Sequence, residues 1–256
     1  MKQKWWILLT LLLCGCGASS QPDQTGTVQN DRPRLSASTE ETAENVAAVE
    51  KNENLEKNPS NSNQNPGEGQ NWTVFAMDTV MQFDAYGGSA NLQEKVKRRV
   101  EELEGELSTT QENSDIFHLN QEKTTELSAD TRYLMQEALA LGAETDGALD
   151  ISIYPVVQSW GFTTGNYRVP SESERESLLK SVDYRLVGLE ADTASIEPGM
   201  MVDLGGVGKG FTGDEVVKAM KEDGVTSALF SLGGNIQTIG TKPDGEKWYV
   251  GIKDPE

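Results

Sequence analysis

The stretch from Val202 to Asp214, Val-Asp-Leu-Gly-Gly-Val-Gly-Lys-Gly-Phe-Thr-Gly-Asp, restricts the fold more than any other part of the sequence. An apolar run stops at Asp203, and glycines around Lys209 follow it. Glycine lets the backbone turn sharply and approach a ligand, and a helix start offers unpaired N–H groups and a positive dipole end to an anion. We therefore expect a strand followed directly by a helix beside a phosphate. The alternative is a glycine-rich turn that only packs a helix on a sheet.

Two common nucleotide-binding motifs do not fit this stretch. A Walker phosphate loop requires Gly-x-x-x-x-Gly-Lys-Ser/Thr, but Asp203 occupies the first glycine position and Gly210 the last position. Gly208, Gly210 and Gly213 do match Gly-x-Gly-x-x-Gly. In a dinucleotide fold, however, the first glycine follows the strand directly, and here three residues intervene after Leu204. We interpret that match as chance.

Residues 1–16 have the order of a secretory signal, with lysines first, an apolar stretch over 5–13 and then Leu-Cys-Gly-Cys. The apolar stretch is shorter than the ~20 residues of a permanent membrane helix. Its end is similar to the bacterial lipoprotein box, with Leu13 at position −3, Gly15 at −1 and Cys16 as the lipidated residue. We expect a lipoprotein signal peptide and a mature chain anchored by lipid, such as palmitate, to the extracytoplasmic face of the cell membrane. A secretory peptide cut elsewhere is the alternative.

Composition divides the remainder into a tether and one domain. Residues 17–71 are rich in Ser, Asn, Gln, Glu, Thr and Pro and cannot bury enough apolar surface to fold, so we predict a disordered tether. Residues 72–256 are long enough for one domain with its own core. Both cysteines lie in the leader, which excludes disulfides, thiolate metal sites and cysteine nucleophiles from the domain. The single histidine, His118, is interpreted as structural, and any metal is expected to be a hard, oxygen-bound cation.

The chain is acidic, with a net charge of −19. This charge argues against a surface for nucleic acid or anionic lipid. If an anionic ligand binds, its charge must be neutralised locally by a lysine, a helix N-terminus or a metal.

Helices and strands are mixed along the domain, and several strand pairs are local, so we predict an α+β fold with largely antiparallel strands. Apolar residues at steps of three and four from Leu92 to Leu107 predict an amphipathic helix, with Asn91 and Glu94 as its capping box. The helices are expected at 92–107, 129–144 after Ser128, 172–182 after Ser171, and 207–222. The stretch 148–162 is expected to be buried and irregular. Strands are expected at 72–76, 80–86, 185–189, 194–197, 200–204, 226–232, 236–240 and 247–252.

Polar residues stand at sharp turns in four separate segments, and two further blocks lie between them. In order and spacing, these segments resemble the ApbE-type FAD:protein FMN transferases over the chain from Trp72 to its last residue. The segments are Ala76-Met-Asp-Thr79, Leu107-Ser-Thr-Thr with Ser114-Asp-Ile-Phe-His-Leu-Asn120, Gly147-Ala-Leu-Asp150, Tyr154-Pro-Val-Val-Gln-Ser-Trp-Gly-Phe162, Val202 to Gly210, and Ser231-Leu-Gly-Gly-Asn235.

The resemblance implies an enzyme that binds FAD and a divalent cation, normally Mg²⁺. It would move the FMN half of FAD onto a threonine hydroxyl of a partner flavoprotein, such as a subunit of a membrane redox complex, and release AMP. Gly206 falls on a metal-ligating position, where it can offer only its backbone carbonyl. Thr110 stands where the family usually has tyrosine, so ring stacking is lost there. By position, the expected FAD-binding residues are Met77, Thr110, Ala148, Leu149, Asp150, Asp203 and Lys209.

The family continues beyond the point that corresponds to residue 256, into an Asp-Pro-x-Thr-Gly block that supplies the other metal ligands. We therefore expect the sequence to be a fragment of a longer product, with loss of the metal site as the alternative. Two other functions remain open: an FAD-binding or FAD-hydrolysing lipoprotein that modifies no protein, and a solute-binding lipoprotein with structural glycine turns.

Overall fold

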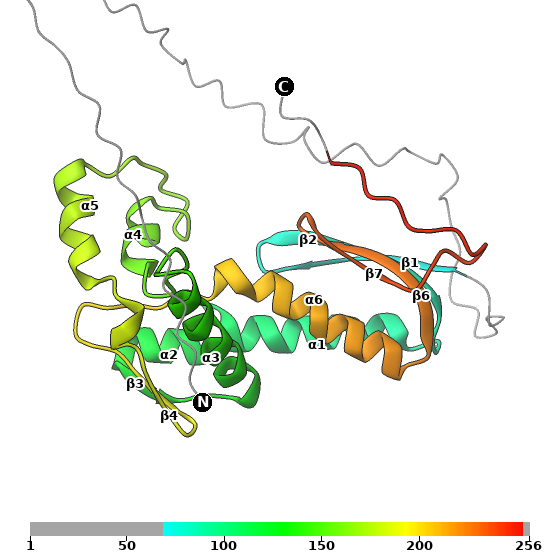
Figure 1. Cartoon of the computed structure of the whole chain (residues 1–256), viewed down its shortest axis with the longest axis horizontal. Helices are drawn as coiled ribbons and strands as arrows, with labels where there is room; N and C mark the ends of the chain where they lie inside the picture. Colours follow the sequence, from blue (N-terminus) through cyan, green and yellow to red (C-terminus); the bar gives the residue numbers. More distant parts are fainter. Residues whose placement is uncertain (1–68, 253–256) are drawn as a thin grey trace, which may run out of the picture. The chain divides into compact units, whose positions relative to one another are not determined.

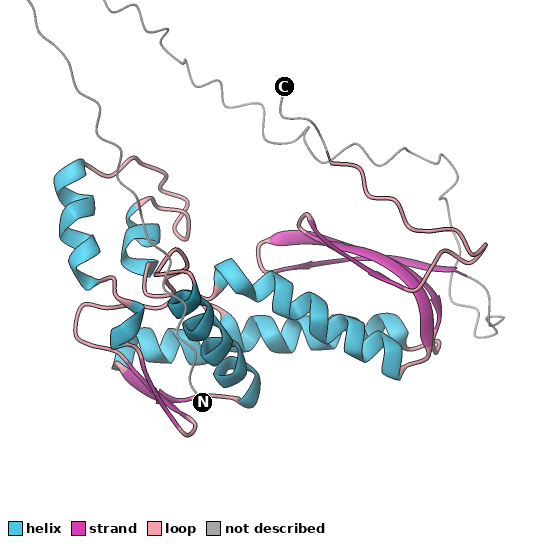
Figure 2. Cartoon of the chain, in the orientation of Figure 1, coloured by secondary structure: helices cyan, strands magenta, loops and turns pink. Residues whose placement is uncertain are grey.

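The computed structural model describes residues 69–252. The predicted signal peptide, Cys16 and nearly all of the predicted tether lie outside these residues. The first strand of the described residues begins at Gly69, three residues before the strand expected at 72–76. Helices and antiparallel sheets are mixed along the chain, which confirms the α+β class (Figure 2). Within the described residues, no helix is both long and apolar enough to span a membrane.

The larger sheet has four antiparallel strands in the order β1-β2-β6-β7. Two hairpins form it, and their strands match those expected at 72–76 and 80–86 and at 226–232 and 236–240. Residues of β2 alternate between buried and exposed, as expected of a strand with one face against a core. The strands are β1 (Gly69–Ala76), β2 (Thr79–Gly87), β6 (Val225–Leu232) and β7 (Asn235–Ile239).

Two long helices, α1 (Leu92–Leu107) and α6 (Gly205–Glu222), lie side by side against this sheet (Figure 1). The predicted apolar positions of α1 are buried, which confirms the helical spacing. One core fills the space between the helices and the sheet. It includes Val96, Val100, Val216 and Met220 from the helices and Met81, Phe83, Phe230 and Leu232 from the strands.

A second core lies among α2 and α3, the small sheet β3-β5-β4 and the chain that leads into α6. Ser128 caps α3 and Ser171 caps α5, because each hydroxyl accepts a hydrogen bond from the backbone N–H three residues later. The elements are α2 (Asp115–Glu122), β3 (Thr124–Glu126), α3 (Ala129–Glu144), α4 (Tyr154–Ser159), α5 (Glu172–Leu178), the 3₁₀ turns η1 (Leu179–Ser181) and η2 (Tyr184–Leu186), β4 (Gly188–Glu190) and β5 (Thr193–Ser195).

Two local predictions about helices were wrong. Asn91 precedes α1 with φ −100° and ψ 10°, and its side chain makes no capping hydrogen bond, because a capping side chain needs an extended backbone at this position. The stretch 148–162 is not wholly irregular, since it contains the short helix α4 with a proline in its first turn.

Two predicted strands are also absent from the described residues. Residues 200–204 form only an isolated bridge between Met201 and Ile153, because a side chain rather than a strand pairs with the backbone of Val202. Residues 247–252 include aromatic and β-branched types that favour strands, but within the described residues no strand pairs with them, and Ile252 is almost fully exposed. The residue types therefore indicated strand propensity, but no partner strand among the described residues is available to pair with this segment.

Candidate functional site

A cavity of about 630 Å³ lies where the β1-β2 turn, the end of α1, the loop after α4 and the start of α6 meet. Four of the predicted ligand-binding residues, which come from three different segments of the sequence, line it together. These residues are Met77, Thr110, Asp203 and Lys209. The fold therefore brings together the hairpin turn and the glycine-rich stretch that the sequence analysis singled out separately.

Met77 occupies a strained position in the turn between β1 and β2. Both turn residues, Met77 with φ 51° and Asp78 with φ 56°, have left-handed backbones, as a two-residue hairpin of type I′ requires. A non-glycine residue in this region costs of order 1 kcal/mol or more, and such strain clusters at functional sites. The Met77 N–H donates to Glu104 Oε1 of α1 at 2.6 Å, and its sulfur lies 3.5 Å from the Thr212 hydroxyl of α6. The turn is thus fixed to both helices at the cavity.

Asp203 stands directly before α6 and shapes the start of this helix. Its N–H donates to the Ile151 carbonyl at 2.8 Å, and its Oδ1 accepts from the Gly205 N–H at 2.7 Å. A Cβ on Gly205 would lie 3.0 Å from that carboxylate oxygen, so glycine suits the close approach. Among the described residues, the N–H of Gly206 has no acceptor. One aspartate and one free N–H therefore mark the positive end of α6 beside the cavity.

Asn120 holds the segment before Asp203 in place. The side chain of Asn120 is 3% exposed, donates to the Val202 carbonyl at 2.8 Å and accepts from the Val202 N–H at 2.6 Å. This amide therefore replaces a neighbouring strand for Val202. The pairing sets the position from which Asp203 and α6 continue.

Lys209 lies in the second turn of α6 and contributes positive charge to the cavity wall. Among the described residues it takes part in no ion pair, so its charge is available to a ligand. Thr110 lies in the loop after α1, where the Ser108 hydroxyl accepts from its N–H at 3.1 Å. The cavity thus combines a cation and a helix N-terminus inside an acidic protein, which is an arrangement suited to a phosphate group.

The other predicted residues do not line this cavity. Ala148, Leu149 and Asp150 lie before α4, and the methyl carbon Cδ1 of Leu149 faces Gly206. The carboxylate of Asp150 accepts from the N–H and hydroxyl of Ser152 and from the N–H of Tyr184. These contacts stabilise the local turn. The roles of Ala148, Leu149, Asp150 and Gly206 in binding stay predictions.

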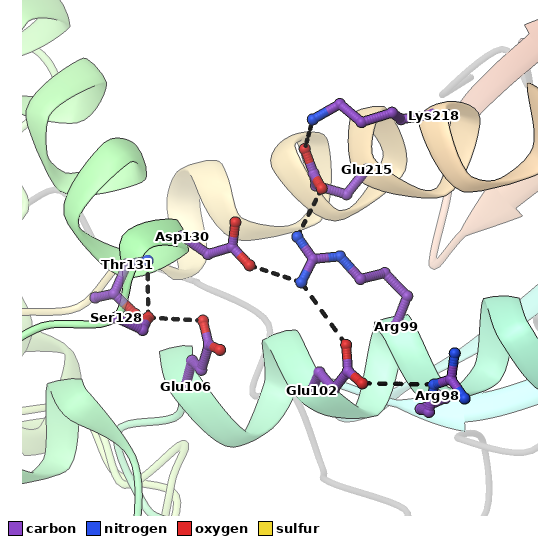
Figure 3. A network of polar contacts seen from close by, with 9 residues as sticks. All are labelled: Arg98, Arg99, Glu102, Glu106, Ser128, Asp130, Thr131, Glu215 and Lys218. Atoms are coloured by element: carbon purple, nitrogen blue, oxygen red, sulfur yellow. Dashed lines mark hydrogen bonds and ion pairs between the residues drawn. The ribbon is translucent and has the colours of Figure 1, made fainter. Parts of the chain in front are cut away.

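A network of charged residues joins the helices α1, α3 and α6 (Figure 3). Arg99 of α1 contacts Asp130 of α3 and Glu215 of α6, each at 2.6 Å. Burial of Glu215 acts to raise its pKa, but hydrogen bonds from Lys218 and Arg99 outweigh this effect and hold the pKa below its ordinary value. The network therefore fixes α1 and α6, which carry the cavity walls, against α3.

Four residues that line the cavity lie outside the segments singled out in the sequence: Glu104, Gln111, Thr163 and Tyr167. Glu104 lies on the polar face of α1, where a carboxylate usually contacts solvent. Tyr167 is an aromatic residue in a loop of Thr, Gly and Asn, and it is exposed in the structure. Its place in this polar stretch was the only feature of the sequence that could have indicated a binding role. His118 lies on α2 away from the cavity lining and contacts Glu122 at 3.1 Å, in line with the structural interpretation.

The described residues do not fit a cation site by themselves. Between Gly69 and Ile252, no group of three or more His, Cys, Asp or Glu side chains is placed to hold a metal ion. Gly206 offers only its backbone carbonyl, and Mg²⁺ requires several well-placed oxygen ligands.

Comparisons with known proteins match the part of the chain that carries this cavity. The model of the ApbE family matches residues 77–256. The chain is 30% identical over 173 residues to the FAD:protein FMN transferase of Vibrio cholerae serotype O1 (strain O395), which covers 65% of this chain and 52% of the relative. It is 27% identical over 201 residues to the FAD:protein FMN transferase of Escherichia coli K12, with 73% of this chain and 56% of the relative covered. The chain thus spans about half the length of these curated relatives.

Solved structures agree in fold. The flavin transferase ApbE from Vibrio cholerae superposes with a TM-score of 0.68 at 27% identity, over 74% of this chain and 65% of that one. The ApbE protein from Thermotoga maritima gives a TM-score of 0.68 at 28% identity, over 73% of this chain and 64% of that one.

Proposed function

Because the chain belongs to the ApbE family, we propose that it transfers FMN from FAD to a threonine hydroxyl of a partner flavoprotein and releases AMP. The observation that carries this proposal is the cavity in which Lys209, the start of α6 and the strained Met77 turn meet. Relatives that are 27% to 30% identical bear the name FAD:protein FMN transferase, which supports the same reaction class.

FAD suits the residues that line the cavity. Its diphosphate is an anion that a lysine and a helix N-terminus can hold. Lys209 lines the cavity, and so does Gly205, the first residue of α6. The turn at Met77 and the side chain of Leu107 add apolar surface for the rest of the dinucleotide. The protein would therefore bind FAD mainly by positioning its phosphates at α6.

The reaction needs charge stabilisation more than a protein nucleophile. The threonine oxygen forms a bond to the FMN phosphorus, the bond from that phosphorus to the AMP oxygen breaks, and the hydroxyl proton passes to a base or to water. Negative charge spreads over the phosphoryl oxygens in such a displacement, and fixed positive groups lower its barrier. Lys209 and the N-terminus of α6 are the groups in the described chain that can act in this way.

Magnesium dependence, a lipid anchor at Cys16 and a place at the extracytoplasmic face of the membrane are further parts of this proposal. The anchor rests on the sequence of residues 1–16, which lie outside the described part. The acceptor is proposed to be a flavoprotein with an accessible threonine, such as a subunit of a membrane redox complex. Cation ligands other than the Gly206 carbonyl would come from outside residues 69–252, since these residues gather no metal-binding cluster.

The test is an incubation of the full chain with FAD, MgCl₂ and a threonine-bearing flavoprotein, followed by gel electrophoresis and detection of flavin fluorescence on the acceptor. The same acceptor with threonine replaced by alanine is the control. Fluorescence that requires both FAD and the threonine supports the transfer. FAD binding without any labelled acceptor would instead identify an FAD-binding protein, and absence of FAD binding would leave a solute-binding role.

A further inference from the structure

We propose that Tyr167 and Phe162 hold a planar ring of the dinucleotide at the cavity whose phosphate-binding end is formed by Lys209 and α6. This inference rests on the proposed function, because it names the residues that bind one part of the same substrate. Both side chains line the cavity, and both come from the loop between α4 and α5.

The two rings are exposed where they could contact a ligand. Phe162 is 59% exposed and Tyr167 is 74% exposed, although both are large aromatic residues. Their ring centroids lie 6.1 Å apart with an interplanar angle of 61°, and Trp160 stacks on Phe162 at 6.3 Å and 7°. Trp160 therefore supports Phe162, and Phe162 supports Tyr167 through an edge-to-face contact. A further planar ring can stack on the surfaces that remain exposed.

The loop that carries these rings is closed by its own backbone. The Arg168 N–H donates to the Trp160 carbonyl at 3.0 Å, which joins the two ends of the loop. Gly161 has φ +80°, and a Cβ there would lie 2.0 Å from the Asn166 carbonyl oxygen, so only glycine permits this closure. Arg168 also pairs with Glu174 on α5. The loop thus presents both rings toward the cavity in a defined conformation.

The chemistry of the cavity selects the kind of ligand. A nucleotide combines a planar ring with a phosphate, and this cavity combines two exposed aromatic rings with Lys209 and a helix N-terminus. Stacking on aromatic side chains is a common way to bind such rings. A purely apolar ligand would leave the charge of Lys209 without a partner. The two ends of the cavity together therefore favour the dinucleotide.

The experiment measures binding of FAD, FMN and ADP to the full chain by isothermal titration. FMN carries the isoalloxazine ring with one phosphate, and ADP carries adenine with a diphosphate. Tyr167→Leu should weaken FAD binding about tenfold, equivalent to ~1.4 kcal/mol, whereas Tyr167→Phe should stay within about twofold of wild type because it keeps the ring. The matched control is Tyr249→Leu, since Tyr249 is 76% exposed and does not line the cavity.

Loss of affinity for FMN but not ADP would assign the isoalloxazine ring to Tyr167, and the reverse would assign adenine. Either result supports the inference when Tyr167→Phe retains binding and the melting temperature is unchanged. Wild-type FAD affinity in Tyr167→Leu would overturn it, including the case in which only transfer to the acceptor slows. If Tyr167→Leu binds FAD like wild type but Lys209→Ala binds it more weakly, the proposed function is retained and only the role of Tyr167 is refuted. If wild type binds no FAD, both fail.

Discussion

Replacement of Asn120 by alanine should lower both the stability of the fold and its affinity for FAD. The Asn120 side chain makes two hydrogen bonds to the backbone of Val202, at 2.6 and 2.8 Å, and both residues are buried. Alanine would leave the N–H and the carbonyl of Val202 without partners in the core. Because Asp203 follows Val202 directly, the disturbance would also reach the start of α6.

The size of the effect follows from those two groups. A buried polar group that loses its partner costs about 1–3 kcal/mol, so two groups give a loss of about 3 kcal/mol in the free energy of unfolding. For a domain of this size, 1 kcal/mol corresponds to roughly 2–4 °C in melting temperature, which predicts a fall of about 6–12 °C. Asparagine loses side-chain conformational entropy on folding and alanine does not, but this difference is too small to offset the loss of the two hydrogen bonds.

Urea unfolding followed by tryptophan fluorescence measures the change, since the chain has five tryptophans. Asn91→Ala is the matched control: Asn91 is exposed, its side chain makes no capping bond, and its loss should change stability by less than about 0.5 kcal/mol. Asn120→Asp keeps the acceptor for the Val202 N–H, but it places a carboxylate oxygen next to the Val202 carbonyl oxygen, and two acceptors repel each other. That variant should recover stability as the pH falls, because a protonated carboxyl can donate.

A cost below about 1 kcal/mol for Asn120→Ala, equal to that of Asn91→Ala, would refute this reasoning. It would mean that the Val202 backbone finds other partners after a small shift. Unchanged FAD affinity in a destabilised Asn120→Ala would separate the stability role from the site.

Further predictions concern charge, anchoring and the cation. Lys209→Ala should weaken FAD binding about tenfold or more with little change in melting temperature. Lys180 is an exposed lysine outside the cavity, so Lys180→Ala should change neither the affinity nor the melting temperature. Equal FAD affinity of the two variants would exclude Lys209 from the site. Glu215→Gln should lower the free energy of unfolding by about 1 kcal/mol at pH 7. The pKa of Glu215 is lowered in the folded state, so this stability difference is present above about pH 4.5 and is lost as the pH falls through the folded pKa. Urea titrations at pH 7 and pH 3.5 measure the difference, and Glu101→Gln, which removes an exposed carboxylate, is the control. Cys16→Ser should release the protein from membranes in a fractionation, and persistent membrane association would contradict the predicted lipid anchor. Residues 69–252 should bind Mg²⁺ only weakly in isothermal titration, because they hold no metal-binding cluster; tight, stoichiometric binding would count against this expectation.

Local patterns predicted much of the fold. The three- and four-residue spacing in 92–107, the serine caps at 128 and 171, and the paired runs around the two-residue turns act within a few residues, and the structure confirms them. The helix that follows Leu204 was also predicted, but it begins at Gly205, so the glycines of this stretch lie in its first turns and none of them has a positive φ. Such features depend on the hydrogen bonds and sterics of neighbouring residues, which the sequence states directly.

Contacts between distant segments were decided only by the tertiary structure. Asn120 pairs with Val202 across 82 positions and prevents the predicted strand, and Tyr167 reaches the cavity only because its loop closes on Gly161. The pairing of Arg99 with Asp130 and Glu215 likewise requires three helices to be in place. The sequence by itself therefore determined the elements, the family resemblance and four residues of the cavity. Packing of the two cores decided which other side chains meet there, because a long-range contact has no signature within the few residues around it.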